Sequence, residues 1–181
     1  MAAIASKRSQ LIPATLGRVT GKPDEQIARI QSTIEQLLGE IERLPADVLY
    51  REPAEGEWPV MSTLAHLEEL LPYWAHEAAD LAASPGRAIG RNLDDPRRVV
   101  PIAEHGHDSL DAIVPRIRVA LGECLKTLRS IPADRWQVVG QHLHRGAMTP
   151  EQIVEAFLCN HTREHAAQIH TTLEALSARP T

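Results

Sequence analysis

The sequence predicts an all-α protein built as a four-helix bundle, and two observations carry that prediction. Four segments of about 20 to 28 residues each repeat apolar side chains along one stripe with the period of an α-helix. No segment alternates convincingly like a β-strand, and only 3% of the 181 residues are aromatic, whereas sheets favour aromatic side chains. Hydrophobic residues make up 43% and charged residues 24%, so we expect the stripes to pack into an ordinary globular core.

The first helix is expected over residues 24–44. Pro23 suits the first helical turn, and the acidic pair Asp24 and Glu25 complements the positive end of the helix dipole. Pro45 stops the helix, because proline cannot donate a backbone hydrogen bond. The apolar stripe consists of Ile27, Ile30, Ile34, Leu37, Leu38, Ile41 and Leu44.

The second and third helices are expected over residues 60–82 and 109–130, with a kink at Pro72 and with Asp108 as the N-cap of the third. Residues 84–107 lie between them and are rich in proline, glycine and aspartate. This composition predicts a long irregular connection on the outside of the bundle. The stripe of the second helix consists of Val60, Leu64, Leu67, Leu71 and Trp74.

The last helix is expected over residues 149–176. Thr149 has the side chain of an N-cap, and Pro150 suits the first helical position. Gln152 stands three residues after the cap, which completes the pattern of a capping box. The start of this helix is therefore the best defined of the four.

Composition excludes several classes of protein. With 24 acidic and 19 basic residues the net charge is −5, which argues against a broad nucleic-acid-binding surface. No apolar run approaches the roughly 20 residues needed to cross a bilayer, so we expect no membrane segment. Cys124 and Cys159 lie in helical patterns without a CxxC spacing, so we expect reduced core thiols in a cytoplasmic protein.

Residues 1–22 differ in character from the rest of the chain. They hold four basic residues and no acidic residue, and they lack the apolar core of a secretory signal. We interpret them as a flexible basic N-terminal arm that precedes a bundle domain over residues 23–181.

The chemistry predicted from the sequence lies in its nine histidines. On a wheel of about 100° per residue, His161 and His165 fall inside the apolar stripe of the last helix, one turn apart. No acidic residue on that stripe supplies partners for their ring nitrogens, whereas a divalent metal ion would bind both rings. His66 lies beside the stripe of the second helix and could turn toward the pair, although a hydrogen-bonded core histidine is the simpler explanation for it alone.

Other histidine patterns can be compared with known metal motifs. Residues 161–165, His-Thr-Arg-Glu-His, match the H-x-x-E-H pattern of inverted zinc proteases, but those enzymes need a larger α/β scaffold and a distant carboxylate ligand. Di-iron carboxylate bundles need two Glu-x-x-His motifs, and this chain offers one, at Glu104 and His107 in a predicted loop. Two close pairs in predicted loops are interpreted as solvated, His105 with His107 and His142 with His144.

Two short motifs resemble the DinB-like family of metal-binding four-helix bundles. Residues 56–60, Gly-Glu-Trp-Pro-Val, followed by residues 64–67, Leu-Ala-His-Leu, resemble the start of that family's second helix. Residues 161–169, with the pattern His-x-x-x-His-x-x-Gln-Ile, resemble the end of its last helix. The resemblance covers about residues 24–176 and implies an up-down-down-up order of the four helices.

The resemblance also implies a site. The family's three metal-ligating histidines carry over onto His66, His161 and His165. A divalent ion such as zinc or nickel would lie between the second and fourth helices, and family members are often homodimers. Members of known activity include transferases and isomerases that use a low-molecular-weight thiol such as bacillithiol, mycothiol or glutathione, and others are described as metal-dependent hydrolases.

We therefore hypothesise a metal-dependent transferase that uses a low-molecular-weight thiol, or a metal-dependent hydrolase. Three neutral imidazoles leave a divalent ion its full charge and an open position, where a thiol would ionise and attack an electrophilic small-molecule substrate. Gln168, Tyr73 and Glu164 are candidates for contacts to the ligands or the substrate, with ordinary surface polar residues as the alternative. Two other hypotheses compete: a non-catalytic metal-binding or stress-response bundle acting as a dimeric interaction module, and a dimerisation bundle whose histidines only pack.

Overall fold

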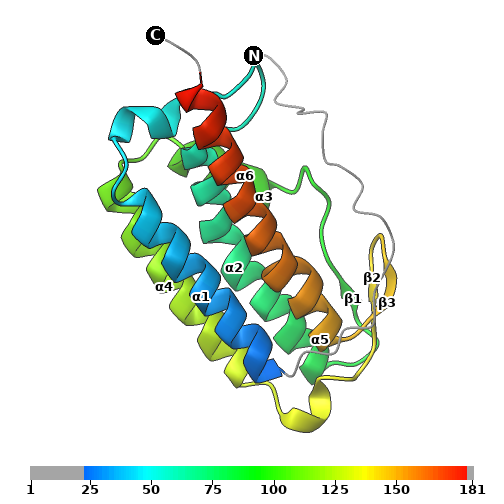
Figure 1. The fold of residues 1–181 in the computed structure, drawn as a ribbon. Helices are drawn as coiled ribbons and strands as arrows, with labels where there is room; N and C mark the ends of the chain where they lie inside the picture. Colours follow the sequence, from blue (N-terminus) through cyan, green and yellow to red (C-terminus); the bar gives the residue numbers. More distant parts are fainter. Residues whose placement is uncertain (1–22, 179–181) are drawn as a thin grey trace.

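The computed structural model describes residues 23–178, which form four long helices (Figure 1). The predicted basic arm at residues 1–22 lies outside the described residues. The first three long helices are α1 (Pro23–Ile41), α2 (Val60–Ala83) and α4 (Leu110–Arg129). The fourth runs without interruption through α5 (Pro150–Ile153), a π-helical segment (Val154–Cys159) and α6 (Asn160–Ser177). Two 3₁₀ helices follow α1 and α4, at Ala46–Tyr50 and Ala133–Arg135.

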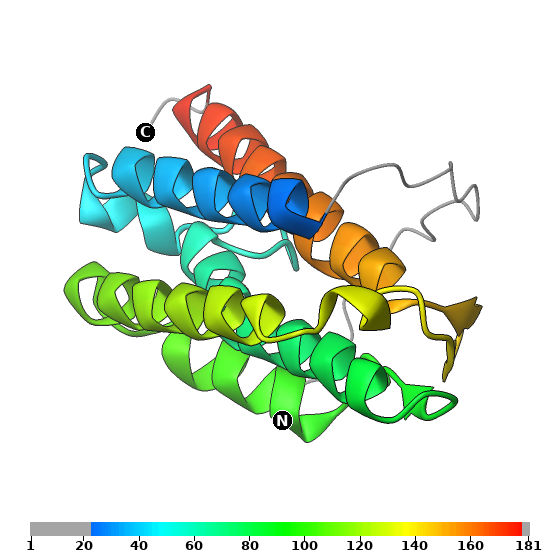
Figure 2. The same cartoon turned by 90° about the horizontal axis from the view of Figure 1, so that it is seen from below.

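The four long helices have the up-down-down-up order that the resemblance implied. α1 and the α5–α6 helix run in one direction, and α2 and α4 run in the other (Figure 1). α1 packs against α6, and α2 packs against both α4 and α6. A further helix, α3 (Pro96–His105), packs against α2 on the side of the bundle away from α1 (Figure 2). The prediction of an all-α four-helix bundle is therefore confirmed.

The predicted apolar stripes form the core. Every stripe residue of α1 through Ile41 is buried, and so are all five stripe residues of α2. α1 ends at Ile41 rather than at Leu44 because the chain tightens there: the Leu44 amide bonds to the Ile41 carbonyl, three residues back, at 3.0 Å. Among the described helices, none combines the length and the apolar composition that a bilayer-spanning segment requires.

The predicted caps have different outcomes. The capping box at the start of α5 is present, since the Gln152 amide donates to Thr149 Oγ1 at 3.2 Å and the Thr149 amide donates to Gln152 Oε1 at 3.0 Å. The prediction of Asp108 as the N-cap of α4 is wrong, because Ser109 occupies that position. The Asp108 carboxylate, which precedes α4, pairs instead with Arg116 on that helix.

The prediction of an irregular connection over residues 84–107 is wrong in two places. The segment contains a short strand, β1 (Ala88–Ile89), and the ten-residue helix α3. Asp95 caps α3, since its side chain accepts a hydrogen bond from the Arg97 amide at 2.8 Å. Ile102 is the one buried residue of α3, so this helix has no apolar stripe for a sequence pattern to reveal.

The expectation of no strands is also wrong, although the sheet is small. β2 (Gly140–His142) pairs in parallel with β1 and antiparallel with β3 (Gly146–Met148). Strands of two or three residues are too short to show alternation. His142 lies in β2 and is buried, which overturns its interpretation as a solvated loop residue; His144 is exposed, and its Nε2 atom lies 3.2 Å from Asn92 Oδ1.

Candidate metal centre

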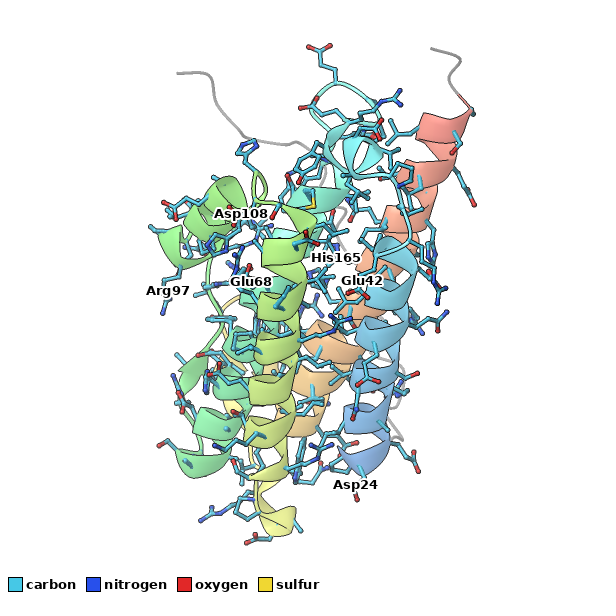
Figure 3. All side chains as sticks on the ribbon, turned by 90° about the vertical axis from the view of Figure 1, so that its left-hand side faces the viewer. Asp24, Glu42, Glu68, Arg97, Asp108 and His165 are labelled. Carbon is cyan, nitrogen blue, oxygen red and sulfur yellow. The ribbon has the colours of Figure 1, made fainter. Side chains whose placement is uncertain are left out.

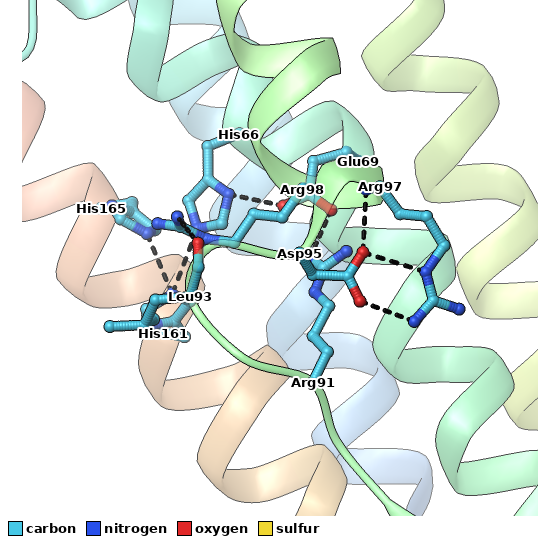
Figure 4. A network of polar contacts seen from close by, with 9 residues as sticks. All are labelled: His66, Glu69, Arg91, Leu93, Asp95, Arg97, Arg98, His161 and His165. Atoms are coloured by element: carbon cyan, nitrogen blue, oxygen red, sulfur yellow. Dashed lines mark hydrogen bonds and ion pairs between the residues drawn. The ribbon is translucent and has the colours of Figure 1, made fainter. Parts of the chain in front are cut away.

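Three histidines from two helices converge between α2 and α6 (Figure 4). The Nε2 atom of His161 lies 3.1 Å from Nε2 of His165 and 3.4 Å from Nε2 of His66. One ligand atom from each ring lies within 4.8 Å of the other two, and this is the one such group of three found among residues 23–178. The structure brings together the three histidines that the sequence singled out, in an arrangement that could hold a metal ion.

The local structure explains this convergence. His161 and His165 are four residues apart on α6, so helical geometry places them on one face. α2 packs against α6, and this contact leaves His66 only 4% exposed. The π-helical segment Val154–Cys159 ends two residues before His161, and π-helical turns are frequent at functional sites because they change which side chains face a partner helix.

Two of the rings are held by an oxygen atom three residues further along the helix. The Nδ1 atom of His66 lies 2.7 Å from Glu69 Oε1, and Nδ1 of His165 lies 2.9 Å from Gln168 Oε1. Because these oxygens accept hydrogen bonds, each Nδ1 carries the proton and each Nε2 keeps a lone pair. Both Nε2 atoms belong to the convergent group. Each ring therefore has the tautomer that a metal-ligating histidine needs, with the proton on Nδ1 and the lone pair on the ligating nitrogen.

The other two predicted contact residues lie differently. The Nδ1 atom of His161 lies 3.5 Å from Glu164 Oε2, so Glu164 takes the same relative position with a longer contact. Tyr73 makes no hydrogen bond with the three histidines, and the Arg91 guanidinium lies over its ring at 3.8 Å from the centroid. Burial raises the pKa of Tyr73 to about 12, so its hydroxyl is protonated at neutral pH. Gln168 is therefore the predicted residue with the closest contact to a histidine of the group.

Burial keeps the three imidazoles neutral. It lowers the pKa of His66 well below the ordinary value, lowers that of His161 to about 2, and lowers that of His165. In their Nδ1–H tautomers His66 and His165 direct Nε2 lone pairs into the group, and the neutral His161 ring in the same tautomer would add a third. A divalent cation would bind these lone pairs without requiring any of the rings to change its protonation, so the donor set fits a metal ion.

A buried ion pair between Glu69 and Arg91 contacts the Nδ1 side of the His66 ring. Glu69 accepts from His66 with one carboxylate oxygen and pairs with Arg91 through the other. The side chains of Glu69 and Arg91 are only 6% and 5% exposed. Burial raises the pKa of Glu69 to about 7, and Arg91 opposes this rise. Neither residue was predicted from the sequence, although an acid three residues after His66 was a visible signal for Glu69.

Two further side chains stand over the group. The side chain of Arg98 reaches from α3 toward the three histidines (Figure 4). Trp58 lies edge-on to His66 with ring centroids 5.7 Å apart. The Arg98 guanidinium lies 5.7 Å from the Trp58 ring centroid. Sequence reasoning missed Arg98 because it missed α3, the helix that carries it.

The remaining histidines do not join the group. His105 lies at the end of α3 rather than in a loop, and its Nδ1 atom lies 2.9 Å from Glu68, which also pairs with Arg116. In Figure 3, Glu68 and Asp108 lie toward one end of the bundle and Asp24 lies at the other. Two more histidines meet surface carboxylates, namely His76 with Glu123 and His170 with Glu40.

The two cysteines are buried core thiols, as the sequence predicted. Burial raises the pKa of both Cys124 and Cys159 to about 12. Both side chains are therefore protonated thiols at neutral pH, and neither of them is an activated nucleophile.

The helix order and the three-histidine group together define a class: four-helix bundles with a candidate metal centre between the second and the last long helix. Residues 19–169 match the sequence profile of the DinB superfamily, and the chain belongs to that family. No curated protein sequence matches it significantly.

Solved structures agree on the fold. YfiT from Bacillus subtilis, a probable metal-dependent hydrolase with an unusual four-helix bundle topology, is similar with a TM-score of 0.72 and 14% identity over 90% of this chain and 91% of YfiT. A mycothiol-dependent maleylpyruvate isomerase is similar with a TM-score of 0.60 and 12% identity, over 89% of this chain and 63% of the isomerase. At these identities the likeness concerns the fold.

Proposed function

We propose that the protein binds one divalent ion, zinc or nickel, through His66, His161 and His165 and transfers a low-molecular-weight thiol to an electrophilic small molecule. The observation that supports this most directly is the convergence of three Nε2 atoms within 4.8 Å. When bound, the ion supplies positive charge that lowers the pKa of a thiol at its open position. The proposal extends to a homodimer acting in the cytoplasm, where unpaired cysteines stay reduced.

The chain's own residues hold and shape the site. The neutral rings would leave the charge of the ion undiminished, in contrast to sites with carboxylate or thiolate ligands. Glu69 and Gln168 fix the orientation of two rings by accepting their Nδ1 protons. Trp58 packs edge-on against the His66 ring, with ring centroids 5.7 Å apart.

One observation and one chemical argument favour thiol transfer over hydrolysis. Glu69 is engaged by both His66 and Arg91, so its carboxylate is not free to take a proton from water. A thiol is far more acidic than water, so it ionises beside a cation without a general base. Because Cys124 and Cys159 are buried and protonated, the thiol has to come from outside the chain.

A thiol-consumption assay tests the function. The full chain, loaded with zinc or nickel, is mixed with glutathione or another small thiol and a chloronitrobenzene electrophile, and loss of free thiol is followed. We expect metal-dependent turnover that is lost in His161→Ala and retained in His170→Ala, because His170 lies on the same helix but outside the group.

The outcomes separate the competing functions. Equal rates with and without metal, or unchanged turnover in His161→Ala, would contradict the proposal. Metal-dependent cleavage of a nitrophenyl ester without thiol would favour a hydrolase. Stoichiometric metal binding without turnover, across several thiols and electrophiles, would favour a non-catalytic metal-binding bundle.

A further inference from the structure

Arg98 is a partly buried cation that forms no ion pair within residues 23–178. Four arginines in this range are intermediate in burial, and the other three contact carboxylates. Those three are Arg87, Arg91 and Arg116. Arg98 instead donates a hydrogen bond from Nη1 to the Leu93 carbonyl oxygen at 2.8 Å. Since a guanidinium carries five N–H donors, most of its capacity is unused.

The guanidinium of Arg98, with its unused N–H donors, lies toward the candidate metal centre. Its side chain extends toward the three histidines, and its positive charge contributes to the lowered pKa of each of them (Figure 4). Two acids that Figure 4 shows in the same network are engaged elsewhere, because Asp95 pairs with Arg97 and Glu69 pairs with Arg91. A desolvated charge without a counter-ion is unfavourable, so this position suits an anion that arrives from outside.

We propose that Arg98 binds an oxyanion, a carboxylate or a phosphate group, on the ligand that occupies the three-histidine site. A planar guanidinium matches the geometry of both groups and can bind either through two parallel hydrogen bonds. The ligand would then present its anionic group to Arg98 and its reacting atom to the histidines. The inference rests on the proposed function, because that function places the reacting atom at the histidines. Oxyanion binding at Arg98 does not itself require turnover.

Calorimetric titration tests the binding step directly. Malonate and inorganic phosphate are titrated into the full chain, with and without zinc, and their uncharged counterpart malonamide serves as the ligand control. We expect Arg98→Gln to weaken anion binding at least tenfold and Arg98→Lys to weaken it less. Arg118→Gln should bind like the wild type, because the Arg118 side chain is 53% exposed and pairs with Glu42, away from the site.

Several results would overturn the inference. These are equal anion affinity in the wild type and Arg98→Gln, absence of anion binding in the wild type, or equal dependence of malonamide binding on Arg98. Zinc affinity, measured separately, distinguishes this failure from failure of the proposed function. A chain that binds zinc without Arg98-dependent anion binding refutes only this inference, and a chain that binds malonate through Arg98 but no zinc supports it while refuting the proposed function.

The oxyanion could belong to the thiol or to the electrophile, and kinetics separates the two sources. If it belongs to the thiol, wild-type protein should prefer 3-mercaptopropionate to 2-mercaptoethanol, and Arg98→Gln should abolish that preference. If it belongs to the electrophile, the same variant should abolish a preference for a carboxylated chloronitrobenzene over a neutral one. In either case KM for the anionic reactant should rise more than kcat falls, and loss of neither preference would contradict the inference.

Discussion

Gln168 is an exposed side chain that supports one ring of the candidate metal centre. Its Oε1 atom accepts from His165 Nδ1 at 2.9 Å and thereby fixes the tautomer and orientation of that ring. We predict that Gln168→Ala weakens zinc binding by about 10-fold, the lower end of the range for such supporting residues. Chelator competition measures the affinity. Gln168→Glu keeps an acceptor oxygen and should retain tight binding, so equal affinities in all three proteins would contradict the assignment.

Gly90 lies so close to the His142 ring that a larger residue would not fit there. Its φ is +94°, and a Cβ atom there would lie 2.9 Å from His142 Nε2. We predict that Gly90→Ala destabilises the protein by about 2–4 kcal/mol, combining backbone strain with overpacking. Gly56→Ala is the matched control, since Gly56 has φ +74° but nothing within 4 Å of the added atom. Urea unfolding should show a clearly larger loss for Gly90→Ala, and equal losses would refute the steric argument.

The sequence predicted some site residues and missed others for physical reasons. His161 and His165 share one helix, so helical spacing alone reveals their common face. His66 needed the family resemblance, because its inward turn depends on how α2 packs against α6. Arg98 approaches from a separate helix, and no periodicity within one segment reports a contact between segments.

At the scale of elements, helix starts depend on local hydrogen bonds that differ in strength. The α5–α6 helix begins with a complete capping box at Thr149, whereas Ser109 at the start of α4 makes no side-chain cap hydrogen bond. We predict that Thr149→Ala costs about 1 kcal/mol of stability. Ser109→Ala should cost distinctly less in the same chemical unfolding experiment. Equal costs would mean that the capping box is not the source of the effect.

Long elements were predictable and short ones were not. The stripes of α1 and α2 are long enough for a 3.6-residue period to be recognised, and their residues are buried as expected, apart from Leu44 beyond the end of α1. α3 buries a single residue, Ile102, and the three strands have two or three residues each. The π-helical segment was also invisible, because a helical wheel assumes one constant angle per residue.

Four histidines make the stability of the whole molecule depend on pH, because their protonation is less favourable in the folded state than in the unfolded state. Burial lowers the pKa of His66, His161 and His165, and it lowers that of His142 to about 4. In the unfolded chain these rings titrate near 6.5, so below about that pH the unfolded state binds more protons than the folded state. Glu69 has the opposite effect on the pH dependence of stability, since its pKa is raised to about 7. It is a single group, whereas four histidines have lowered pKa values.

We therefore predict that the metal-free protein loses stability as pH falls from about 6.5 toward 4. Urea unfolding at several pH values between 7 and 4.5 measures this loss. The unfavourable protonation of His142 continues to act down to about pH 4, and that of His161 down to about pH 2. A free energy of unfolding that stays constant or rises between pH 6.5 and 4.5 would contradict the prediction.

The up-down-down-up order matters because it brings the second and the last long helix into contact, and the candidate centre depends on that contact. The most direct test is zinc titration of the metal-free full chain against a competing chelator, followed by X-ray absorption on the loaded protein. We predict one zinc ion per chain with three imidazole nitrogens at about 2.0–2.1 Å, with binding lost in His161→Ala and kept in His170→Ala. No stoichiometric binding, or unchanged binding in His161→Ala, would contradict the account.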